Sequence, residues 1–175
     1  MWTYLPSEGT TADDDKTVIL FNDYLPKCCP LLTKLSLISR GNTAEFFQHH
    51  VQTLVCLPNM DSLISLHTDM ALLFEDIHNL GQYSWEAILP PRLQHLTVRE
   101  TGFEEYGLPP VDQYLVPLAD LFVRLAQDCL DGRCCTLKEI RYCSRALYHD
   151  PAFVLGNRII KAFQSSGVNF ILERL

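Results

Sequence analysis

The sequence lacks the short motifs that mark most nucleotide-binding enzymes and hydrolases. None of the patterns G-x-S-x-G, G-x-x-x-x-G-K-[ST], G-x-G-x-x-G and H-E-x-x-H occurs in its 175 residues. Glycine is scarce, with eight residues, which leaves few places where a backbone could cradle a phosphate. We therefore expect no catalytic site and no cofactor.

Long hydrophobic runs and basic clusters are also missing. No stretch reaches the roughly 18 consecutive apolar residues of a membrane-spanning helix, and the first eight residues lack the basic start and apolar core of a signal peptide. The formal net charge is -7, which repels phosphate backbones and anionic lipids. We expect a cytoplasmic or nuclear protein that binds neither nucleic acid nor membrane.

Cysteine is present, but not at the spacing of a structural metal site. There are seven cysteines and no Cys-x-x-Cys pair, the usual mark of structural zinc. The group Cys129, Cys134, Cys135, Cys143 and His149 invites a zinc interpretation. The missing pair favours instead thiols that pack as small hydrophobic groups, and we expect no metal and, in a reducing compartment, no disulfide.

The composition is that of an ordinary globular domain. Hydrophobic residues make up 47% of the chain and charged residues 20%, far from the signature of disorder. The length fits one domain. We assign residues 18–175 to that domain and residues 1–17 to an N-terminal tail or partial repeat.

One short pattern recurs along the chain: proline, any residue, apolar, two polar residues, apolar. It occurs in Pro30–Leu35, Pro58–Leu63 and Pro91–Leu96, and again without the proline in Cys135–Ile140. Apolar residues then alternate in three copies, which predicts short strands with one apolar face. In the second copy Ser65 interrupts the alternation, so its register stays open.

Five strands are predicted, with helices between them. The strands start at Leu32, Met60, Leu93, Leu137 and Val168, at unequal intervals of which the third is the longest. Apolar stripes of helical period predict helices over Ala44 to Val55, Val111 to Leu130 and Pro151 to Ser166. The alternation predicts an α/β fold, an irregular leucine-rich-repeat-like solenoid with parallel strands on its concave face and helices on its convex face.

In such a solenoid the outward side chains of the strands form the binding surface. The alternation places a mixed set of charges there, with a basic centre. The predicted partner-binding residues are Lys34, Ser36, Ser62, His95, Thr97, Arg99, Glu139 and Arg141, with Ile38 and Cys143 on the same parity.

Three segments resemble the leucine-rich-repeat region of fungal F-box proteins. They are Leu89–Glu100, Leu137–Ile140 and the closing Gly167–Glu173, and the similarity extends over roughly residues 18–175. In that family an F-box of about forty residues docks to a ubiquitin-ligase core while the repeat arc selects the substrate. Met1–Lys16 is too short for an F-box, so the resemblance implies the recognition half alone.

These observations favour a protein-protein interaction module, a substrate-recognition arc of a ubiquitin-ligase adaptor without its F-box. The alternative is a small α/β enzyme with Cys143 as nucleophile and His149 as base, because ligands gather at the carboxyl ends of parallel strands. A third hypothesis is a structural role, in which uncapped solenoid ends cause self-association.

Overall fold

A computed structural model describes residues 22–38, 53–74, 77–100, 111–134, 136–144 and 153–174. Residues 22–28 are helical. The strands are β1 (Lys34–Leu37), β2 (Ser65–Asp69), β3 (His95–Arg99), β4 (Glu139–Ser144) and β5 (Asn169–Arg174). The helices are α3 (Trp85–Ile88), α4 (Val111–Leu130) and α5 (Phe153–Phe163), and the 3-10 helices are η1 (Leu57–Asn59), η2 (Met70–Leu72) and η3 (Ile77–Gln82).

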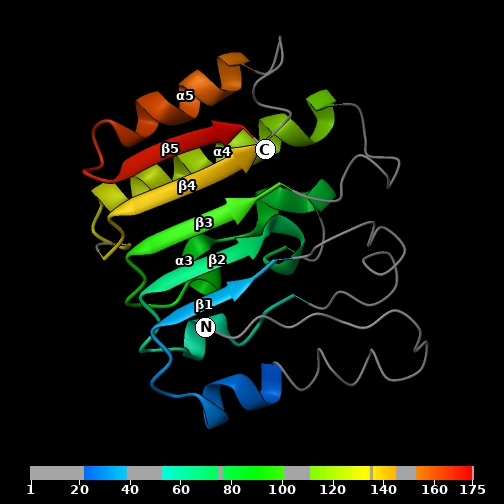
Figure 1. Ribbon diagram of the computed structural model, residues 1–175. Coiled ribbons are helices and arrows are strands. Elements are labelled where there is room, and N and C mark those ends of the chain that lie inside the picture. The colour runs from blue at the N-terminus through cyan, green and yellow to red at the C-terminus, as the bar shows by residue number, and fades with distance from the viewer. Residues whose placement is uncertain are drawn as a thin grey trace, which may run out of the picture.

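The five strands form one parallel sheet in the order in which they occur in the chain, β1-β2-β3-β4-β5 (Figure 1). The predicted parallel strands are therefore confirmed. Because the strand order never reverses, the described sheet has no topological switch point, where open α/β sheets usually bind their ligands. The chain instead advances one strand at a time in a single direction.

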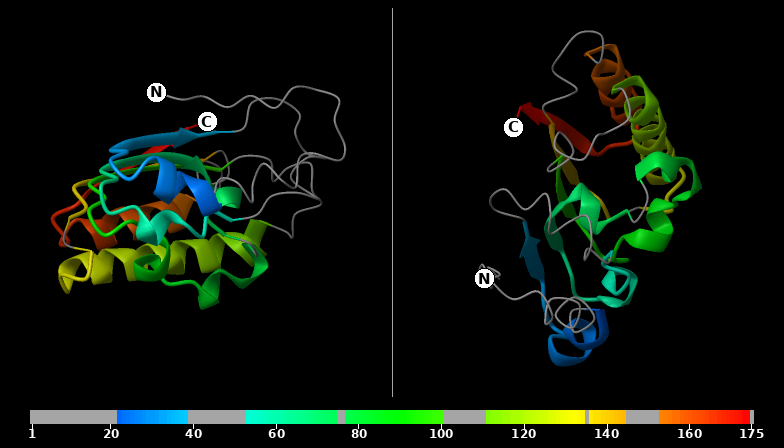
Figure 2. Two further views of the ribbon diagram at one scale, coloured as in Figure 1. Left: turned by 90° about the horizontal axis from the view of Figure 1, so that it is seen from below. Right: turned by 90° about the vertical axis from the view of Figure 1, so that its right-hand side faces the viewer.

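The described helices lie on one side of this sheet. Figure 2 shows α4 and α5 together under one face, with α3 on the same side, while the opposite face carries none of the labelled helices. The α/β architecture is thus two layers. Within the described part of the chain, none of the helices has the length and apolar character to cross a membrane.

Each of the first four strands is entered through the same turn. An apolar residue donates its backbone N–H to the carbonyl three residues earlier, which closes a tight turn. The pairs are Leu32 with Cys29, Leu63 with Met60, Leu93 with Pro90, and Leu137 with Cys134, at 3.0 to 3.2 Å.

This turn also settles the register of the second strand. Leu63, not Met60, occupies the position of Leu93, and β2 starts three residues later than the proline-based alignment predicts. Ser62 therefore lies in the turn before β2 and not on the sheet, so its placement among the face residues was wrong. The cause is that Met60 and Leu63 are both apolar, and the spacing to Pro58 selected the wrong one.

With the corrected register, the repeat becomes more regular. Leu35, Leu66, Leu96, Ile140 and Phe170 lie side by side in the sheet. Successive members of this row are nearly evenly spaced along the chain, except that the interval from Leu96 to Ile140 is clearly longer. The long interval holds α4, whose 20 residues add several turns of helix.

The predicted helices are confirmed in part. Val111–Leu130 matches α4, and Gly132 follows it with a φ of 80°. Leu130, expected on the apolar side, is 54% exposed, because it lies on the last turn beyond the sheet. Of the helix predicted over residues 44–55, residues 44–52 lie outside the described part, and residues 53–55 are not helical.

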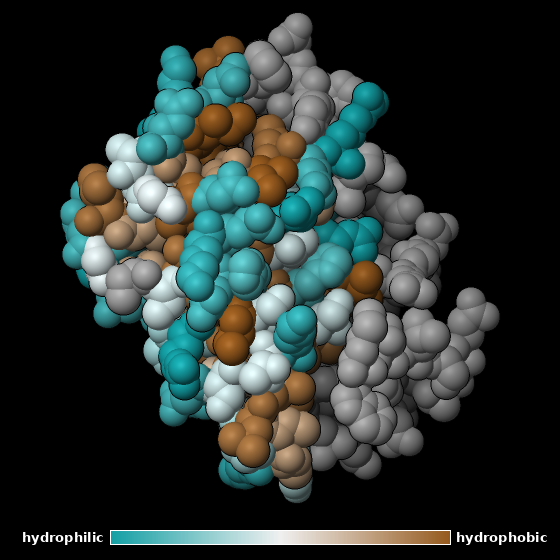
Figure 3. Space-filling view, turned by 60° about the vertical axis from the view of Figure 1, so that its left-hand side comes forward, coloured by the Kyte–Doolittle hydropathy of each residue, from teal (hydrophilic) through white to brown (hydrophobic). Residues whose placement is uncertain are grey.

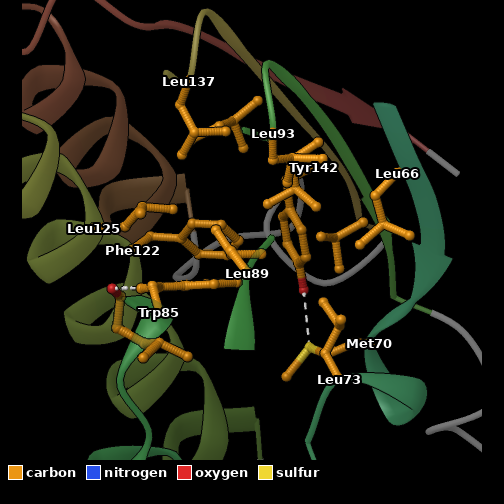
Figure 4. Packing of buried hydrophobic residues seen from close by; sticks show 14 of the residues in the cluster. Leu66, Met70, Leu73, Trp85, Leu89, Leu93, Phe122, Leu125, Leu137 and Tyr142 are labelled. Carbon is orange, nitrogen blue, oxygen red and sulfur yellow. Dashed lines mark hydrogen bonds between the residues drawn. The ribbon is translucent and has the colours of Figure 1, made fainter. Parts of the chain in front are cut away.

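The core lies between the sheet and the helices. Trp85 packs against Phe74 and Phe122, with ring centroids 5.5 Å apart in both pairs, and its indole N–H donates to the Leu121 carbonyl at 2.9 Å (Figure 4). Tyr142, on the helix side of β4, is fully buried and its hydroxyl donates to the Met70 sulfur at 3.7 Å. Both polar tips are thus satisfied inside the core, as buried Trp and Tyr require.

The two sides of β3 should respond differently to truncation. Leu96 is 1% exposed and faces the helices, whereas its neighbour Thr97 is half-buried on the other side. We expect Leu96→Ala to lower the free energy of unfolding by about 2 to 5 kcal/mol and Thr97→Ala to change it by less than about 0.5 kcal/mol. Urea denaturation measures both, and equal losses would contradict the assigned parity.

Thr68 is a polar side chain on the helix side of β2. Thr68 is fully buried, in register with Val98, and its hydroxyl has no hydrogen-bond partner among the described residues. Burying an unpaired hydroxyl lowers the stability of the folded state.

We expect Thr68→Val, which has nearly the same shape, to raise the free energy of unfolding by about 1 kcal/mol. Thr97→Val is the control on the opposite side of the sheet. A loss of stability would show that the hydroxyl is paired.

Candidate functional site: the polar face of the sheet

The side of the sheet opposite the helices carries an ordered array of mostly polar side chains, which we call the polar face. Its members stand in three rows across the strands, because parallel register places every second residue of each strand beside its counterparts. The rows are Lys34, Ser65, His95, Glu139 and Asn169; Ser36, His67, Thr97, Arg141 and Ile171; and Asp69, Arg99, Cys143 and Glu173.

Seven of the eight predicted face residues lie in these rows, and Ser62 does not. The prediction omitted six members that the structure adds: Ser65, His67, Asp69, Asn169, Ile171 and Glu173. The first three were hidden by the wrong register of β2. The last three were visible as the outward positions of the predicted final strand.

Exposure decreases along the strands. In the first row, at the amino ends, Lys34, His95 and Asn169 are exposed. In the third row, Asp69 is fully buried and Cys143 is 8% exposed. A large partner therefore has its widest access at the amino ends of the strands. Figure 3, which brings that side forward, shows hydrophilic atoms over much of the middle of the visible surface.

A hydrogen-bonded network joins β4 to β5. The Arg141 guanidinium donates to Glu173 and, at 3.4 Å, to Glu139. Asn169 donates to the second oxygen of Glu139 at 3.4 Å, and Cys143 to Glu173 at 3.7 Å. The hydrogen bond to Glu139 and the charge of Glu173 raise the pKa of Arg141. In this half of the face Arg141 is compensated by two carboxylates, and these bonds hold the side chains in place.

In the other half, Asp69 is the register neighbour of Arg99, but no ion pair between described residues joins them. Arg99 on β3 makes no hydrogen bond or ion pair with any residue in the described part of the chain, and Lys34 on β1 is exposed. A basic centre was predicted from Arg99 and Arg141 together. The carboxylates around Arg141 reduce it to Arg99, which keeps its donors for an external acceptor.

His67 lies beside Thr97 in the middle row. Burial lowers the pKa of His67, and the positive charge of Arg99 lowers it further, against the opposing effect of Asp69. Its imidazole is therefore neutral at pH 7, and it adds a hydrogen-bonding group but no charge to the face.

At the carboxyl ends of the strands a second polar contact is buried. The Ser144 hydroxyl donates to the Glu100 carboxylate, and the Glu100 backbone N–H donates to the Cys143 carbonyl at 2.8 Å. Glu100 is 9% exposed and Ser144 is fully buried. This contact continues the pairing of β3 with β4 past the last ladder residue, and the Ser144 side chain has the parity of Tyr142, which faces the helices.

The environment of Cys143 does not favour a nucleophile. Burial and the adjacent Glu173 carboxylate raise the pKa of the Cys143 thiol, whereas a reactive cysteine needs a lowered one. His149, the proposed base, lies outside the described residues, as does Cys135 of the zinc hypothesis. Among the residues that the structure describes, no three Cys, His, Asp or Glu side chains come together to hold a metal ion.

The depressed pKa of His67 makes stability depend on pH. The unfolded chain takes up its proton near the ordinary value of 6.5 and the folded chain only at lower pH, so the unfolded state binds more protons between the two values. The free energy of unfolding should therefore fall as pH decreases below about 6.5. Urea denaturation at pH 7.5 and 5.5 should show a smaller fall in His67→Gln than in wild type.

The matched control for this experiment is His95→Gln, which changes the exposed histidine on the next strand. An identical pH dependence of wild type and His67→Gln would mean that His67 is not the responsible group.

Comparison with family models, with curated proteins and with solved structures gave no match to this chain. The resemblance to the leucine-rich-repeat region of fungal F-box proteins therefore stays a prediction from the sequence pattern.

Proposed function

We propose that this chain is a protein-binding module of the leucine-rich-repeat type and that the polar face is its interface. The observation that carries the proposal is the set of in-register polar rows on a sheet side that no described helix covers. Such rows present many separate hydrogen-bonding groups over an extended area, which suits a protein surface.

The winding of the chain supports a solenoid. Sequential strand order, one layer of helices and four equivalent turns are what stacked repeats produce. Three of the four intervals between register partners are nearly equal, and their length lies just above the range that is usual for leucine-rich repeats.

The size of the face sets the expected strength of binding. Five strands about 4.8 Å apart and about 17 Å long give roughly 300 Å² of flat area. A standard interface buries about 800 Å² on each partner. A partner held by the polar face alone should bind weakly, so detection needs cross-linking or proximity labelling.

The resemblance to F-box proteins suggests which class of partner to look for. We propose a protein that is presented for ubiquitination, with the chain acting as the recognition part of an adaptor. Arg99 favours a partner that places a carboxylate over the carboxyl end of β3.

The test compares proximity-labelled partners of the wild-type chain with those of Arg99→Gln. Glutamine removes the charge without adding a carboxylate beside Asp69, the register neighbour of Arg99. We expect at least one partner to lose tenfold or more of its labelling. Arg141 is unsuitable for this test, because changing it would leave the Glu139 and Glu173 carboxylates without their cation.

Lys161→Gln is the matched control, since Lys161 is an exposed cation on α5, on the helix side of the sheet. Circular dichroism verifies that both variants fold. If Arg99→Gln and Lys161→Gln recover the same partners as wild type, the polar face is not the interface.

A further inference from the structure

Two cysteines meet where α4 ends. The backbone turns back on itself after Leu130, with Gly132 at a φ of 80°, a left-handed conformation that favours glycine. The N–H groups of Arg133 and Cys134 both donate to the Asp128 carbonyl, at 2.8 and 3.2 Å. This closure brings the backbone of Cys134 beside the last turn of the helix, where Cys129 lies.

The side chains of the two cysteines adjoin the same part of the core, where Cys129 belongs to the buried cluster and Cys134 packs against it. They are close enough for Cys129 to be the largest influence on the pKa of the Cys134 thiol. Cys129 is 9% exposed and packs in the core, whereas Cys134 is half-buried at the edge of the same cluster. Cys134 is thus the more accessible of the two cysteines to a reagent in solution.

The surroundings favour reaction at Cys134. The hydrogen bond from Cys129 lowers the pKa of the Cys134 thiol, and Arg133 acts in the same direction, against burial and the carboxylates of Asp128 and Glu86. Cys56 provides the contrast, because burial raises the pKa of its thiol. Thiolates, not thiols, attack disulfides.

We propose that Cys129 and Cys134 form a redox-active dithiol, a site that a small-molecule disulfide such as oxidised glutathione converts to an intramolecular cross-link. The Cys134 thiolate attacks one sulfur of the disulfide, forms a mixed disulfide and releases one glutathione thiolate. The Cys129 sulfur, having lost its proton to solvent, attacks the Cys134 sulfur and displaces the second glutathione. Two electrons pass from the protein to the glutathione, and the protein loses two hydrogens.

The cross-link joins the end of α4 to the segment that leads into β4. The Cys134 carbonyl accepts the N–H of Leu137, which is the turn that starts this strand. Oxidation would therefore tie a helix of the outer layer to a strand of the sheet, without spanning any long loop. In the chain-entropy account, so short a loop adds little stability.

The experiment treats the full-length native protein with oxidised glutathione at pH 7.5, blocks remaining thiols and digests it with trypsin without reduction. Cleavage after Arg124, Arg133 and Lys138 places Cys129 in residues 125–133, and Cys134 with Cys135 in residues 134–138. We expect mass spectrometry to find these two peptides joined, and dithiothreitol to separate them. Cys56 should remain a blocked thiol.

Two adjacent substitutions identify the partner of Cys129. In Cys135→Ser the linked peptides should persist, and in Cys134→Ser they should decrease at least tenfold, with circular dichroism showing that both variants fold. Linkage that persists in Cys134→Ser and disappears in Cys135→Ser overturns the assignment. So does a bond within residues 134–138, or the absence of any linked peptide after oxidation.

Discussion

The register of the sheet depends on a shared backbone acceptor at the starts of β2, β3 and β4. Two successive N–H groups, those of Ile64 and Ser65, donate to the Thr33 carbonyl, and the same arrangement recurs at the carbonyls of Ile64 and Gln94. A slip of one residue would exchange the two sides of a strand, so these acceptors keep the apolar residues toward the helices. The polar face exists because this contact repeats from strand to strand.

The two halves of the polar face differ in how many internal hydrogen bonds and ion pairs their side chains make. Around Arg141, carboxylates on β4 and β5 use up its charge, so a partner would have to break internal hydrogen bonds to engage it. Around Arg99, no such bonds with the described residues have to be broken. A partner that binds the β1–β3 half therefore disrupts fewer existing ion pairs than one that binds around Arg141. This difference is the physical reason to propose that half as the centre of the interface.

The sequence was sufficient to predict the parallel strands, the bounds of α4 and the parity of β1, β3 and β4, because leucines at fixed spacing after a turn leave little choice. It was insufficient at β2, where Met60 and Leu63 both fit the apolar position and only the backbone contact to Thr33 separates them. The carboxylate network around Arg141 joins residues 32 positions apart, and the contact of Cys129 with Cys134 depends on how one helix ends. Neither leaves a short motif that can be read from the chain.

The helix layer and the sheet have different natural widths. Packed helices stand about 8 to 10 Å apart, whereas neighbouring strands stand about 4.8 Å apart. α4 and α5 pack against each other on the side of the sheet where β4 and β5 lie. Behind these two strands the difference in spacing favours a sheet that curves toward its polar face. A concave surface of this kind would fit a partner with a rounded surface.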